Sequence, residues 1–209
     1  MLKFYMTPGS CSTGIHILLE ELELLFEVYV MNMLRGDLHT SDYLAVNPKG
    51  TIPSLVVEND LAVTDFQSIA WWLGRKYPKK NLIPASLEGE IKVLELMNYA
   101  VNTIHGQGFT RIFTTEKYSD DEQQHACIKE QGEVIVRKGF DIINDAFVGD
   151  EYLLENFSIA DAALFYNEFW ADRLGIELPT RCRQHYDTLL NRPKVRGVLM
   201  EEGYSSVFK

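Results

Sequence analysis

Two kinds of hydrophobic pattern alternate along the first eighty residues, and this alternation limits the possible folds more than any other feature of the chain. Residues 2 to 6 and 26 to 31 are short β-rich runs, and between them leucine and isoleucine recur at the spacing of an amphipathic helix. A strand entered through Pro53, a hairpin return at residues 61 to 63 and a helix from Thr64 complete the segment. This order predicts a small α/β domain.

From Ser86 onward the pattern is helical only. Apolar residues recur at intervals of 3, 4 and 3 between Leu94 and Ile104, as in the seam of a helical bundle. Residues 120 to 147 predict a second long helix. The run from Phe157 to Asp161 predicts a helix start with a capping box, in which Ser158 caps and Asp161 reaches back.

These patterns divide the chain into two domains. The stretch PKKNLIP, which begins at Pro78, has the composition of a linker. We therefore expect an α/β domain over residues 1–78, a linker over residues 79–85 and an all-helical domain over residues 86–209. A chain of 209 residues is long enough for each domain to bury its own core.

Charge and cysteine content exclude several classes of function. The formal net charge of -10 opposes binding to nucleic acids and anionic membranes, and no apolar stretch is long enough to span a bilayer. Cys11, Cys127 and Cys182 are odd in number and widely spaced, so they fit neither a disulfide framework nor a metal site. The five histidines form no paired metal motif. We expect a cytoplasmic protein without a bound metal.

Cys11 stands where the first helix begins, in the stretch TPGSCS. The first turn of a helix carries partial positive charge and free N–H groups, which stabilise a thiolate and lower the pKa of a cysteine. Ser10 and Ser12 offer additional donors to the sulfur. The pattern predicts an ionised, nucleophilic Cys11, and the alternative is a buried structural cysteine. Because position 14 is Gly14, any redox cycle must use an external thiol.

Two further stretches are candidates for binding. In NPKGTIPSL, a cis Ile52–Pro53 bond would direct the Ile52 N–H and C=O outward as a hook for an extended peptide. The alternative is an ordinary edge-strand proline. At the third helix, a capping box from Thr64 to Gln67 would leave N–H groups for a carboxylate, with Asp65 beside them to pair an ammonium group. The alternative there is plain capping.

Taken in order, these features resemble one family. The motifs are TPGSCS from Thr7, DYLAVNPKGTIPSL from Asp42, FSIADAALF from Phe157 and RPKVRGVL from Arg192. The whole chain is similar to the cytosolic glutathione transferases, and most similar to the bacterial beta class, which has a cysteine at this position. The resemblance implies a thioredoxin-like domain followed by a helical bundle, a homodimer, a role in detoxification, and glutathione as substrate.

The resemblance also implies roles for residues of the first domain. Cys11 corresponds to the cysteine that contacts or bonds the glutathione sulfur. The segment Thr51, Ile52 and Pro53 corresponds to the backbone hook for the cysteinyl part of glutathione. Asp65 corresponds to the acidic residue that faces the γ-glutamyl end, and the N–H of Phe66 to a donor for its carboxylate.

Three further residues are assigned by the same resemblance. Arg35 lies roughly where a basic residue meets the glycine carboxylate of glutathione. Asn98 would reach the site of the partner subunit, and His105 would stand near the sulfur. The chain departs from the family pattern at Phe66, where a small residue is usual. Relative to that pattern one extra residue stands between His105 and Gly108, and an insertion of this kind bulges or breaks a helix.

Two chemistries remain open at the sequence level. In the first, a bound glutathione thiolate attacks a small electrophile. In the second, Cys11 and glutathione form and release a mixed disulfide while a disulfide or peroxide is reduced. A cysteine beside the sulfur favours the second. The departures at Phe66 and His105 motivate another class, a non-catalytic glutathione-transferase-like binding or regulatory protein. An isomerase of the maleylacetoacetate type is disfavoured, because the serine- and arginine-rich first-helix pattern is absent.

Overall fold

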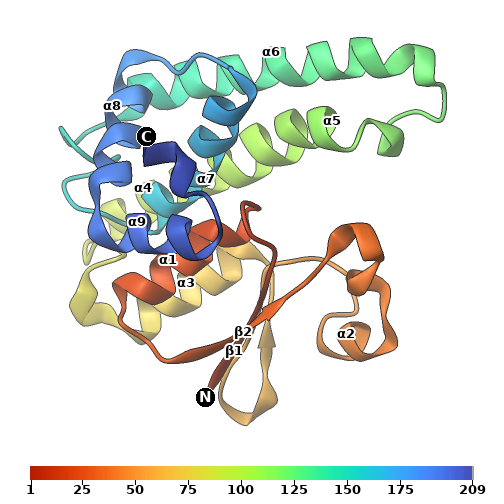
Figure 1. Cartoon of the computed structure of the whole chain (residues 1–209). Helices are drawn as coiled ribbons and strands as arrows, with labels where there is room; N and C mark the ends of the chain where they lie inside the picture. The colour runs from red at the N-terminus through yellow and green to blue at the C-terminus, as the bar shows by residue number, and fades with distance from the viewer. Residues whose placement is uncertain (209) are drawn as a thin grey trace. The chain divides into compact units, whose positions relative to one another are not determined.

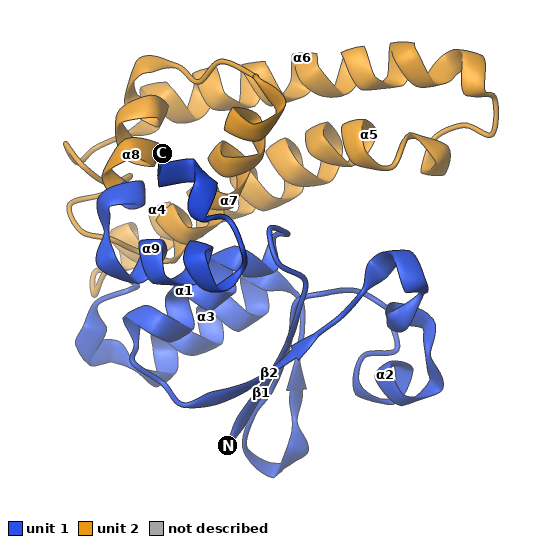
Figure 2. Cartoon of the chain, viewed as in Figure 1, with its two compact units in different colours: residues 1–83, 189–209 blue, residues 84–188 orange. Residues whose placement is uncertain are grey.

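The computed structural model describes residues 1–208, which separate by internal contacts into two compact units (Figure 2). Unit 1 comprises residues 1–83 together with the described residues from Leu189 onward, and unit 2 comprises residues 84–188. The predicted domain limits place everything after residue 85 in the helical domain, whereas the C-terminal segment packs with the α/β part. The predicted domain boundaries follow the order of the chain, whereas the two units are defined by internal contacts, so the two divisions differ. The predicted boundaries stay a prediction.

Unit 1 contains a four-stranded sheet in the order β2-β1-β3-β4. The strand β1 is parallel to β2 and antiparallel to β3, and β4 returns antiparallel to β3. Their bounds are Leu2–Met6 for β1, Phe26–Val30 for β2, Ser54–Val56 for β3 and Ala62–Val63 for β4. This mixed sheet, with its helical crossover between β1 and β2, confirms the predicted thioredoxin-like fold.

Helices α1 (Ser12–Glu21) and α3 (Phe66–Lys76) pack against each other on one side of this sheet, and α2 (Ser41–Val46) lies on the other side (Figure 1). The apolar residues that predicted these helices form the core, because one side of each helix must leave water. Phe4 of β1, Leu18 of α1 and Leu73 of α3 are all 0% exposed.

The C-terminal helix α9 (Pro193–Glu201) packs against α1 within unit 1. Arg192, just before α9, forms an ion pair with Glu21 at the end of α1, with 2.9 Å between Nη2 and Oε2. Pro193 stands at the first position of α9, where its missing N–H costs nothing. Helix α9 is thus held against α1, whose N-cap residue is Cys11.

Unit 2 is helical throughout. One continuous rod is made of α4 (Leu87–Asn98), a π-helix (Tyr99–Phe109) and α5 (Thr110–Phe113). Helix α6 (Glu122–Ala146) runs back alongside this rod (Figure 1), and α7 (Ile159–Leu174) packs on α4 and on the π-helix. Helix α8 (Thr180–Asn191) begins in unit 2 and ends in unit 1. The predicted helical bundle is confirmed.

The helix around His105 is widened into a π-helix that begins at Tyr99, so the prediction of a distorted helix in this region is confirmed. The π-helix spans 11 residues without breaking the rod, since the residues at both of its ends keep right-handed helical dihedrals. Long π-helical stretches are rare, because the wider turn packs its own axis poorly. Here α6 approaches closely: a Cβ on Gly132 would lie 2.8 Å from the Gly108 carbonyl oxygen. The widened helix therefore packs closely against α6.

Helix α7 begins with the predicted capping box. Ser158 accepts a hydrogen bond from the Ala160 N–H, while Asp161 accepts one of 2.8 Å from the Ser158 N–H. Asp161 is fully buried and also contacts His185 of α8, with 3.1 Å between Oδ1 and Nε2. The other ring nitrogen of His185 lies 2.8 Å from Glu168. These carboxylates raise the pKa of His185 to about 10 despite burial, which acts in the opposite direction.

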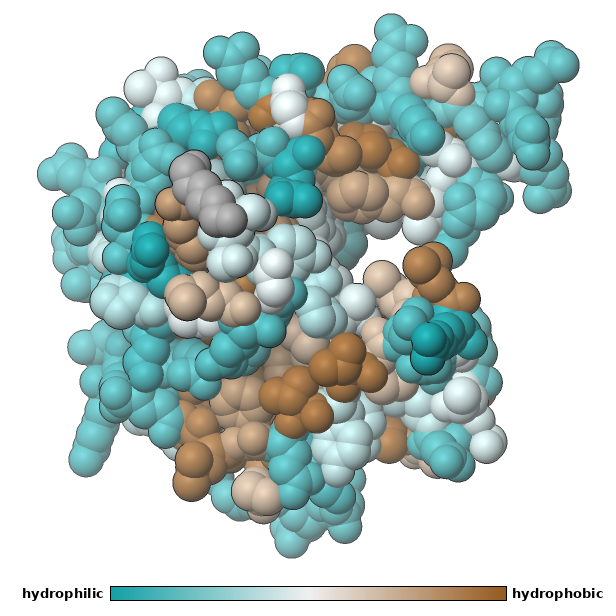
Figure 3. Space-filling model, viewed as in Figure 1, coloured by the Kyte–Doolittle hydropathy of each residue, from teal (hydrophilic) through white to brown (hydrophobic). Residues whose placement is uncertain are grey.

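The face drawn in Figure 3 is polar in most places. Apolar atoms gather over β2, where Val28 and Val30 are exposed (Figure 3). Among residues 1–208 no group of three or more histidine, cysteine, aspartate or glutamate side chains is placed to hold a metal ion. None of the described helices combines the length and the apolar character needed to cross a membrane.

Candidate functional site

The loop before Cys11 is a tight turn stabilised by hydrogen bonds of the Ser10 and Ser12 hydroxyl groups. The Ser10 hydroxyl donates to the Thr7 carbonyl oxygen at 2.7 Å, and the Thr7 N–H donates to the Ser12 hydroxyl at 3.1 Å. The two serine hydroxyls also contact each other. The prediction that they donate to the Cys11 sulfur is therefore wrong, because they are engaged with the turn that places the sulfur.

Cys11 is the N-cap residue of α1, and its side chain makes no capping hydrogen bond. The thiol donates to the carbonyl oxygen of Ile52, with 3.6 Å between Sγ and O, and Cys11 is 8% exposed. Burial raises the pKa of the thiol to about 12. The N–H groups of Cys11 and Ser12 act to lower this pKa, while the charge of Asp65 raises it further.

The predicted thiolate at the start of α1 is therefore wrong for this structure. The helix start does favour the anion, as the sequence argument assumed, but removal of the sulfur from water outweighs that effect. At neutral pH Cys11 is a buried S–H group that donates a hydrogen bond. This corrects the charge state of Cys11 and leaves its position at the site intact.

The Ile52–Pro53 bond is cis, as the hook interpretation requires. Pro53 directly precedes β3, which pairs with both β1 and β4, so the alternative of an ordinary edge-strand proline is wrong. The preceding carbonyl of Thr51 accepts hydrogen bonds from the Tyr43 hydroxyl and, at 2.8 Å, from the Asn47 amide. Within residues 1–208 the Ile52 N–H makes no hydrogen bond. The backbone at Ile52 thus offers one unused donor beside the Cys11 sulfur.

Asp65 lies next to this backbone, at the start of α3. Its carboxylate accepts a hydrogen bond of 3.0 Å from the Thr51 hydroxyl and forms an ion pair of 2.8 Å with Lys49. The sequence predicts that Asp65 pairs with an ammonium group, and Lys49 of the chain itself supplies one. Lys49 was missed, although it stands inside the quoted stretch NPKGTIPSL. Asp65 is half-exposed, so the pair faces solvent.

The cap of α3 differs from the expected one by a single residue. The N-cap residue is Asp65 rather than Thr64, and its side chain makes no capping hydrogen bond, so the predicted capping box is wrong. The Thr64–Asp65 peptide bond is cis. Phe66 opens the helix with its ring 2% exposed. A ring buried to this extent belongs to the core of unit 1 and does not line an open surface.

The remaining predicted site residues stand on other elements of the chain. Arg35 is exposed on a short 3₁₀ turn, Met33–Arg35. Asn98 is exposed at the end of α4, and His105 lies within the π-helix, both in unit 2. The structure thus brings Cys11, Ile52 and Asp65 together, with Thr51 between them, and leaves the other three assignments as predictions.

His105 has its own surroundings within unit 2. Its Nδ1 lies 3.1 Å from the Tyr166 hydroxyl, and its ring meets Trp170 edge to face at 5.0 Å between centroids. Burial lowers the pKa of His105 to about 4, so the imidazole is neutral at pH 7. A neutral ring beside a tyrosine hydroxyl can accept or donate one hydrogen bond, but it does not supply a positive charge to a thiolate.

The cluster of unit 1 has a definite chemical capacity. It offers an S–H donor, an unused backbone N–H and a carboxylate at a helix start, with an ammonium group beside it. These groups match an extended peptide-like ligand that carries a sulfur and a charged amino-acid end.

Comparison with known proteins agrees with this interpretation. Residues 9–76 match the family described as glutathione S-transferase, N-terminal domain. Glutathione S-transferase GstA of Escherichia coli O157:H7 is 28% identical over 207 residues, which cover 97% of this chain and 99% of that protein. A zeta-class glutathione S-transferase of Euphorbia esula is 30% identical over 125 residues, 58% of this chain and 55% of that protein.

A solved structure gives the same result for the fold as a whole. A glutathione transferase homolog from Sulfitobacter, solved with bound glutathione, superimposes with a TM-score of 0.88 at 25% identity, over 98% of this chain and 99% of that one. The similarity thus runs through the α/β part and the helical part alike, so the chain is similar to glutathione transferases over nearly its whole length.

Proposed function

We propose that the chain binds glutathione at the Cys11 cluster and uses it as substrate, as a beta-like glutathione S-transferase. The observation that carries the proposal is the position of the Cys11 sulfur beside the cis-proline backbone of Ile52, whose N–H is unused among residues 1–208. The bound glutathione in the Sulfitobacter homolog supports it.

The groups present fit the parts of glutathione. The cysteinyl part would lie along Ile52, whose N–H donates to it and whose carbonyl accepts from it. The γ-glutamyl end would lie at Asp65 and the start of α3, where the ligand ammonium competes with Lys49 for the carboxylate. The glycine carboxylate would meet Arg35, with Lys49 as a second cation once Asp65 is engaged. The Phe66 N–H would donate to the γ-glutamyl carboxylate. Asn98 would reach the site of the partner subunit, and His105 would stand near the glutathione sulfur.

Conjugation is the chemistry that the charge state of Cys11 favours. A thiol whose pKa is about 12 is almost wholly protonated at pH 7, so it is a poor nucleophile but a ready donor. On binding, the glutathione thiol would lose its proton to solvent, and the Cys11 S–H would turn from the Ile52 carbonyl to the glutathione sulfur and stabilise the resulting thiolate. That thiolate then attacks the small electrophile, forms the carbon–sulfur bond and displaces the leaving group.

Reduction of a disulfide or peroxide is the second candidate, and the presence of sulfur rather than oxygen at position 11 favours it. Cys11 would lose its proton to solvent and attack a substrate disulfide, which joins Cys11 to one half of the substrate and expels the other half as a thiolate; a first glutathione thiolate would then displace the bound half and leave Cys11 as a mixed disulfide with glutathione. With a peroxide, Cys11 would become a sulfenic acid as the alcohol or water leaves, and a first glutathione thiol would condense with it to the same mixed disulfide and release water. A second glutathione thiolate would release it and restore Cys11. This path requires glutathione binding or loop movement to lower the pKa of Cys11.

A homodimer is proposed as the working form. On helix α4 the exposed apolar residues Leu87 and Ile91 lie one turn apart, and the exposed Asn98 follows on the same face two turns after Ile91. An apolar helical face of this kind fits a second copy, and it would carry Asn98 toward the partner subunit. Light scattering with Ile91→Lys against Lys92→Ala tests this, since the first should yield monomers. A cytoplasmic location and a detoxification role complete the proposal.

The competing proposal is a non-catalytic relative that acts as a binding or regulatory protein. The buried, protonated Cys11 is the observation that favours it. Calorimetric titration with glutathione decides first whether the ligand binds at all. Turnover of a chlorodinitrobenzene and of a small disulfide then separates conjugation from reduction. Absence of binding contradicts the enzymatic proposal and supports the non-catalytic protein, and binding with neither activity supports the non-catalytic protein as well.

A further inference from the structure

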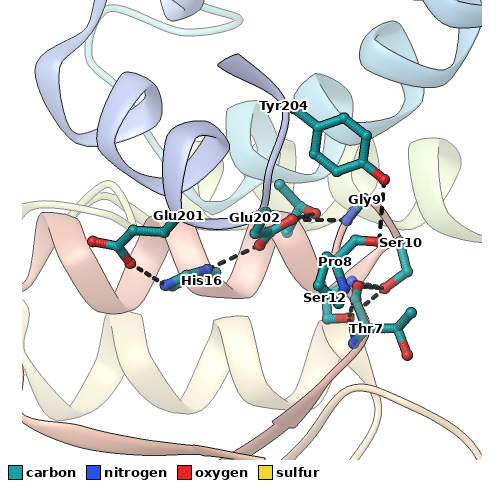
Figure 4. Close-up of polar contacts among 10 residues, drawn as sticks. Thr7, Pro8, Gly9, Ser10, Ser12, His16, Glu201, Glu202 and Tyr204 are labelled. Atoms are coloured by element: carbon teal, nitrogen blue, oxygen red, sulfur yellow. Dashed lines mark hydrogen bonds and ion pairs between the residues drawn. The ribbon is translucent and has the colours of Figure 1, made fainter. Parts of the chain in front are cut away.

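A buried carboxylate from the C-terminal segment lies behind the Cys11 loop. Glu202 follows α9, and its side chain is 2% exposed although its neighbour Glu201 is 66% exposed. Figure 4 shows the Glu202 carboxylate pointing at the loop and at the first turns of α1. A carboxylate removed from water to this extent requires donors that replace its hydration.

Three donors surround this carboxylate, and two of them flank Cys11. Its Oε2 accepts from the Gly9 N–H at 2.8 Å and from the Thr13 hydroxyl at 2.7 Å. Its Oε1 lies 2.9 Å from Nδ1 of His16, one turn further along α1. Gly9 and Thr13 stand two residues before and two residues after Cys11. The Glu202 Oε2 atom therefore links Gly9 to Thr13 and fixes the distance between the residues on either side of Cys11.

Tyr204 holds the same loop from above. Its hydroxyl donates to the Pro8 carbonyl at 3.4 Å, and its ring lies over Gly9, as Figure 4 shows. A Cβ on Gly9 would collide with the Tyr204 hydroxyl and ring, and Gly9 adopts a positive φ of 71°. Only glycine meets both conditions at this position.

We propose that Glu202 and Tyr204, here called the C-terminal clamp, position Cys11. The clamp keeps residues 9–13 closed, so that the thiol stays buried against the Ile52 carbonyl. Release of the clamp opens the loop, admits water to the sulfur and removes the fixed placement that a bound sulfur ligand would meet. Glu202 touches no reacting atom and acts only through Gly9 and Thr13.

A purely structural role for Glu202, as a fastener of α9 on α1, is the competing interpretation. The chain offers a matched control for it. Glu21 pairs with Arg192 and links the same two helices, but it contacts neither flank of Cys11. Glu21→Gln therefore weakens the attachment of α9 to α1 and leaves the contacts of the Cys11 segment in place. Glu202→Gln weakens that attachment and also removes contacts to the Cys11 segment.

The test is alkylation of the folded protein, with each cysteine followed separately by mass spectrometry. Cys127 is exposed and reports reagent activity, while Cys182 is buried in unit 2 and reports unfolding. We expect Glu202→Gln to raise the alkylation rate of Cys11 at least tenfold, with Cys182 still protected. Glu21→Gln and Glu201→Gln should stay within twofold of the original protein.

A second pair of variants keeps the test decisive if Glu202→Gln does not fold. Thr13→Val removes one donor to Glu202 while keeping the shape of the side chain, and Thr13→Ser restores the hydroxyl. The rate at Cys11 should rise several-fold in the first and return to the original value in the second. Equal rates in Thr13→Val and the original protein, or an equal rise in Glu21→Gln, would overturn the positioning role.

The consequence for turnover rests on the proposed function, whereas the alkylation result does not. If glutathione is the substrate, Glu202→Gln should raise the KM for glutathione more than it lowers kcat, because the ligand meets a loosened loop. A protein that never binds glutathione contradicts the proposed function and leaves the alkylation test standing. Normal glutathione kinetics in Glu202→Gln, with unchanged Cys11 alkylation, contradicts the clamp alone.

Discussion

The thiol of Cys11 donates a hydrogen bond to the carbonyl oxygen of Ile52, with 3.6 Å between Sγ and that oxygen. This contact joins the start of α1 to the cis-proline segment before β3. It gives the thiol an acceptor and excludes water from it, so the proton is retained. Because of this contact, Cys11 can either donate a hydrogen bond to glutathione or act as a nucleophile that stays protonated until the contact is broken.

Replacement of Cys11 separates these two roles. A serine hydroxyl still donates, so Cys11→Ser should keep conjugation of a chlorodinitrobenzene within about tenfold of the original rate, whereas Cys11→Ala should lose more, about 10²-fold. Disulfide reduction should vanish in both variants if the mixed disulfide forms on Cys11. Steady-state kinetics of both reactions make the comparison, with Cys127→Ser as control. Undiminished reduction in Cys11→Ser would contradict any covalent role.

Loss of the Asp65 carboxylate should weaken glutathione binding without weakening the fold. Asp65→Asn removes the charge that faces the γ-glutamyl ammonium, and we expect the Kd for glutathione to rise about tenfold or more. Its ion pair with Lys49 is half-exposed, so the free energy of unfolding should change by less than about 1 kcal/mol. Calorimetry and urea denaturation measure the two quantities.

The exposed pair of Glu58 with Lys76, at 3.3 Å, supplies the control for this variant. Glu58→Gln changes a comparable surface ion pair of unit 1 that lies outside the proposed site. It should leave the Kd for glutathione unchanged. Equal effects of Glu58→Gln and Asp65→Asn on the Kd would contradict the assignment of Asp65.

Phe66 should respond as a core residue. Because its ring is 2% exposed, Phe66→Ser should lower the free energy of unfolding by about 3–5 kcal/mol. Leu61→Ser, at a position 59% exposed in the same unit, should stay within about 0.5 kcal/mol. Denaturant unfolding of both variants is the measurement. A stable Phe66→Ser protein with tighter glutathione binding would show instead that the ring crowds the ligand.

The buried His185 should make unfolding depend on pH. Asp161 and Glu168 hold its folded-state pKa near 10, above the ordinary histidine value, so its contribution to stability is complete below about pH 6.5 and is lost as the pH rises toward 10. Burial also raises the pKa of Glu168, which acts in the same direction. The free energy of unfolding should therefore fall by up to about 1 kcal/mol per pH unit between pH 6.5 and 8.5.

His185→Gln supplies the comparison for this dependence. The variant should be less stable at pH 6.5 and should lose most of the slope, because no imidazole remains to bind a proton. Arg183 of α8 also faces Glu168 and stays in place as a fixed charge. Denaturation at pH 6.5, 7.5 and 8.5 checks the slope. A steeper fall in the variant than in the original protein would contradict the assignment.

Periodic segments of the sequence predicted the elements well. The strand at residues 2 to 6, the capping box of Ser158 and Asp161, and the distorted helix around His105 all follow from local rules, and the structure contains each of them. The order of Cys11, Ile52 and Asp65 along a thioredoxin-like domain was enough to bring them together, since this topology places the starts of α1, β3 and α3 at neighbouring positions.

The protonation state of Cys11 could not be predicted from the residues that surround it in the sequence. A helix start predicts stabilisation of an anion, but the desolvation that outweighs it comes from the packing around the loop. Glu202 supports that packing from 191 positions further along the chain, and nothing in its own surroundings distinguishes it from Glu201. Lys49 was missed for a related reason, because a surface lysine acquires a partner only when Asp65 is placed beside it.

The pH dependence of Cys11 reactivity in the absence of glutathione tests the central claim most directly. The rate of alkylation at Cys11 is followed by mass spectrometry from pH 6 to 10, with Cys127 in the same sample as the exposed reference. A buried thiol held by the Ile52 carbonyl predicts a slow rate that is still rising at pH 10, after the rate at Cys127 has reached its plateau. A plateau at or below about pH 8.5 would show an accessible or activated thiolate and would contradict the account.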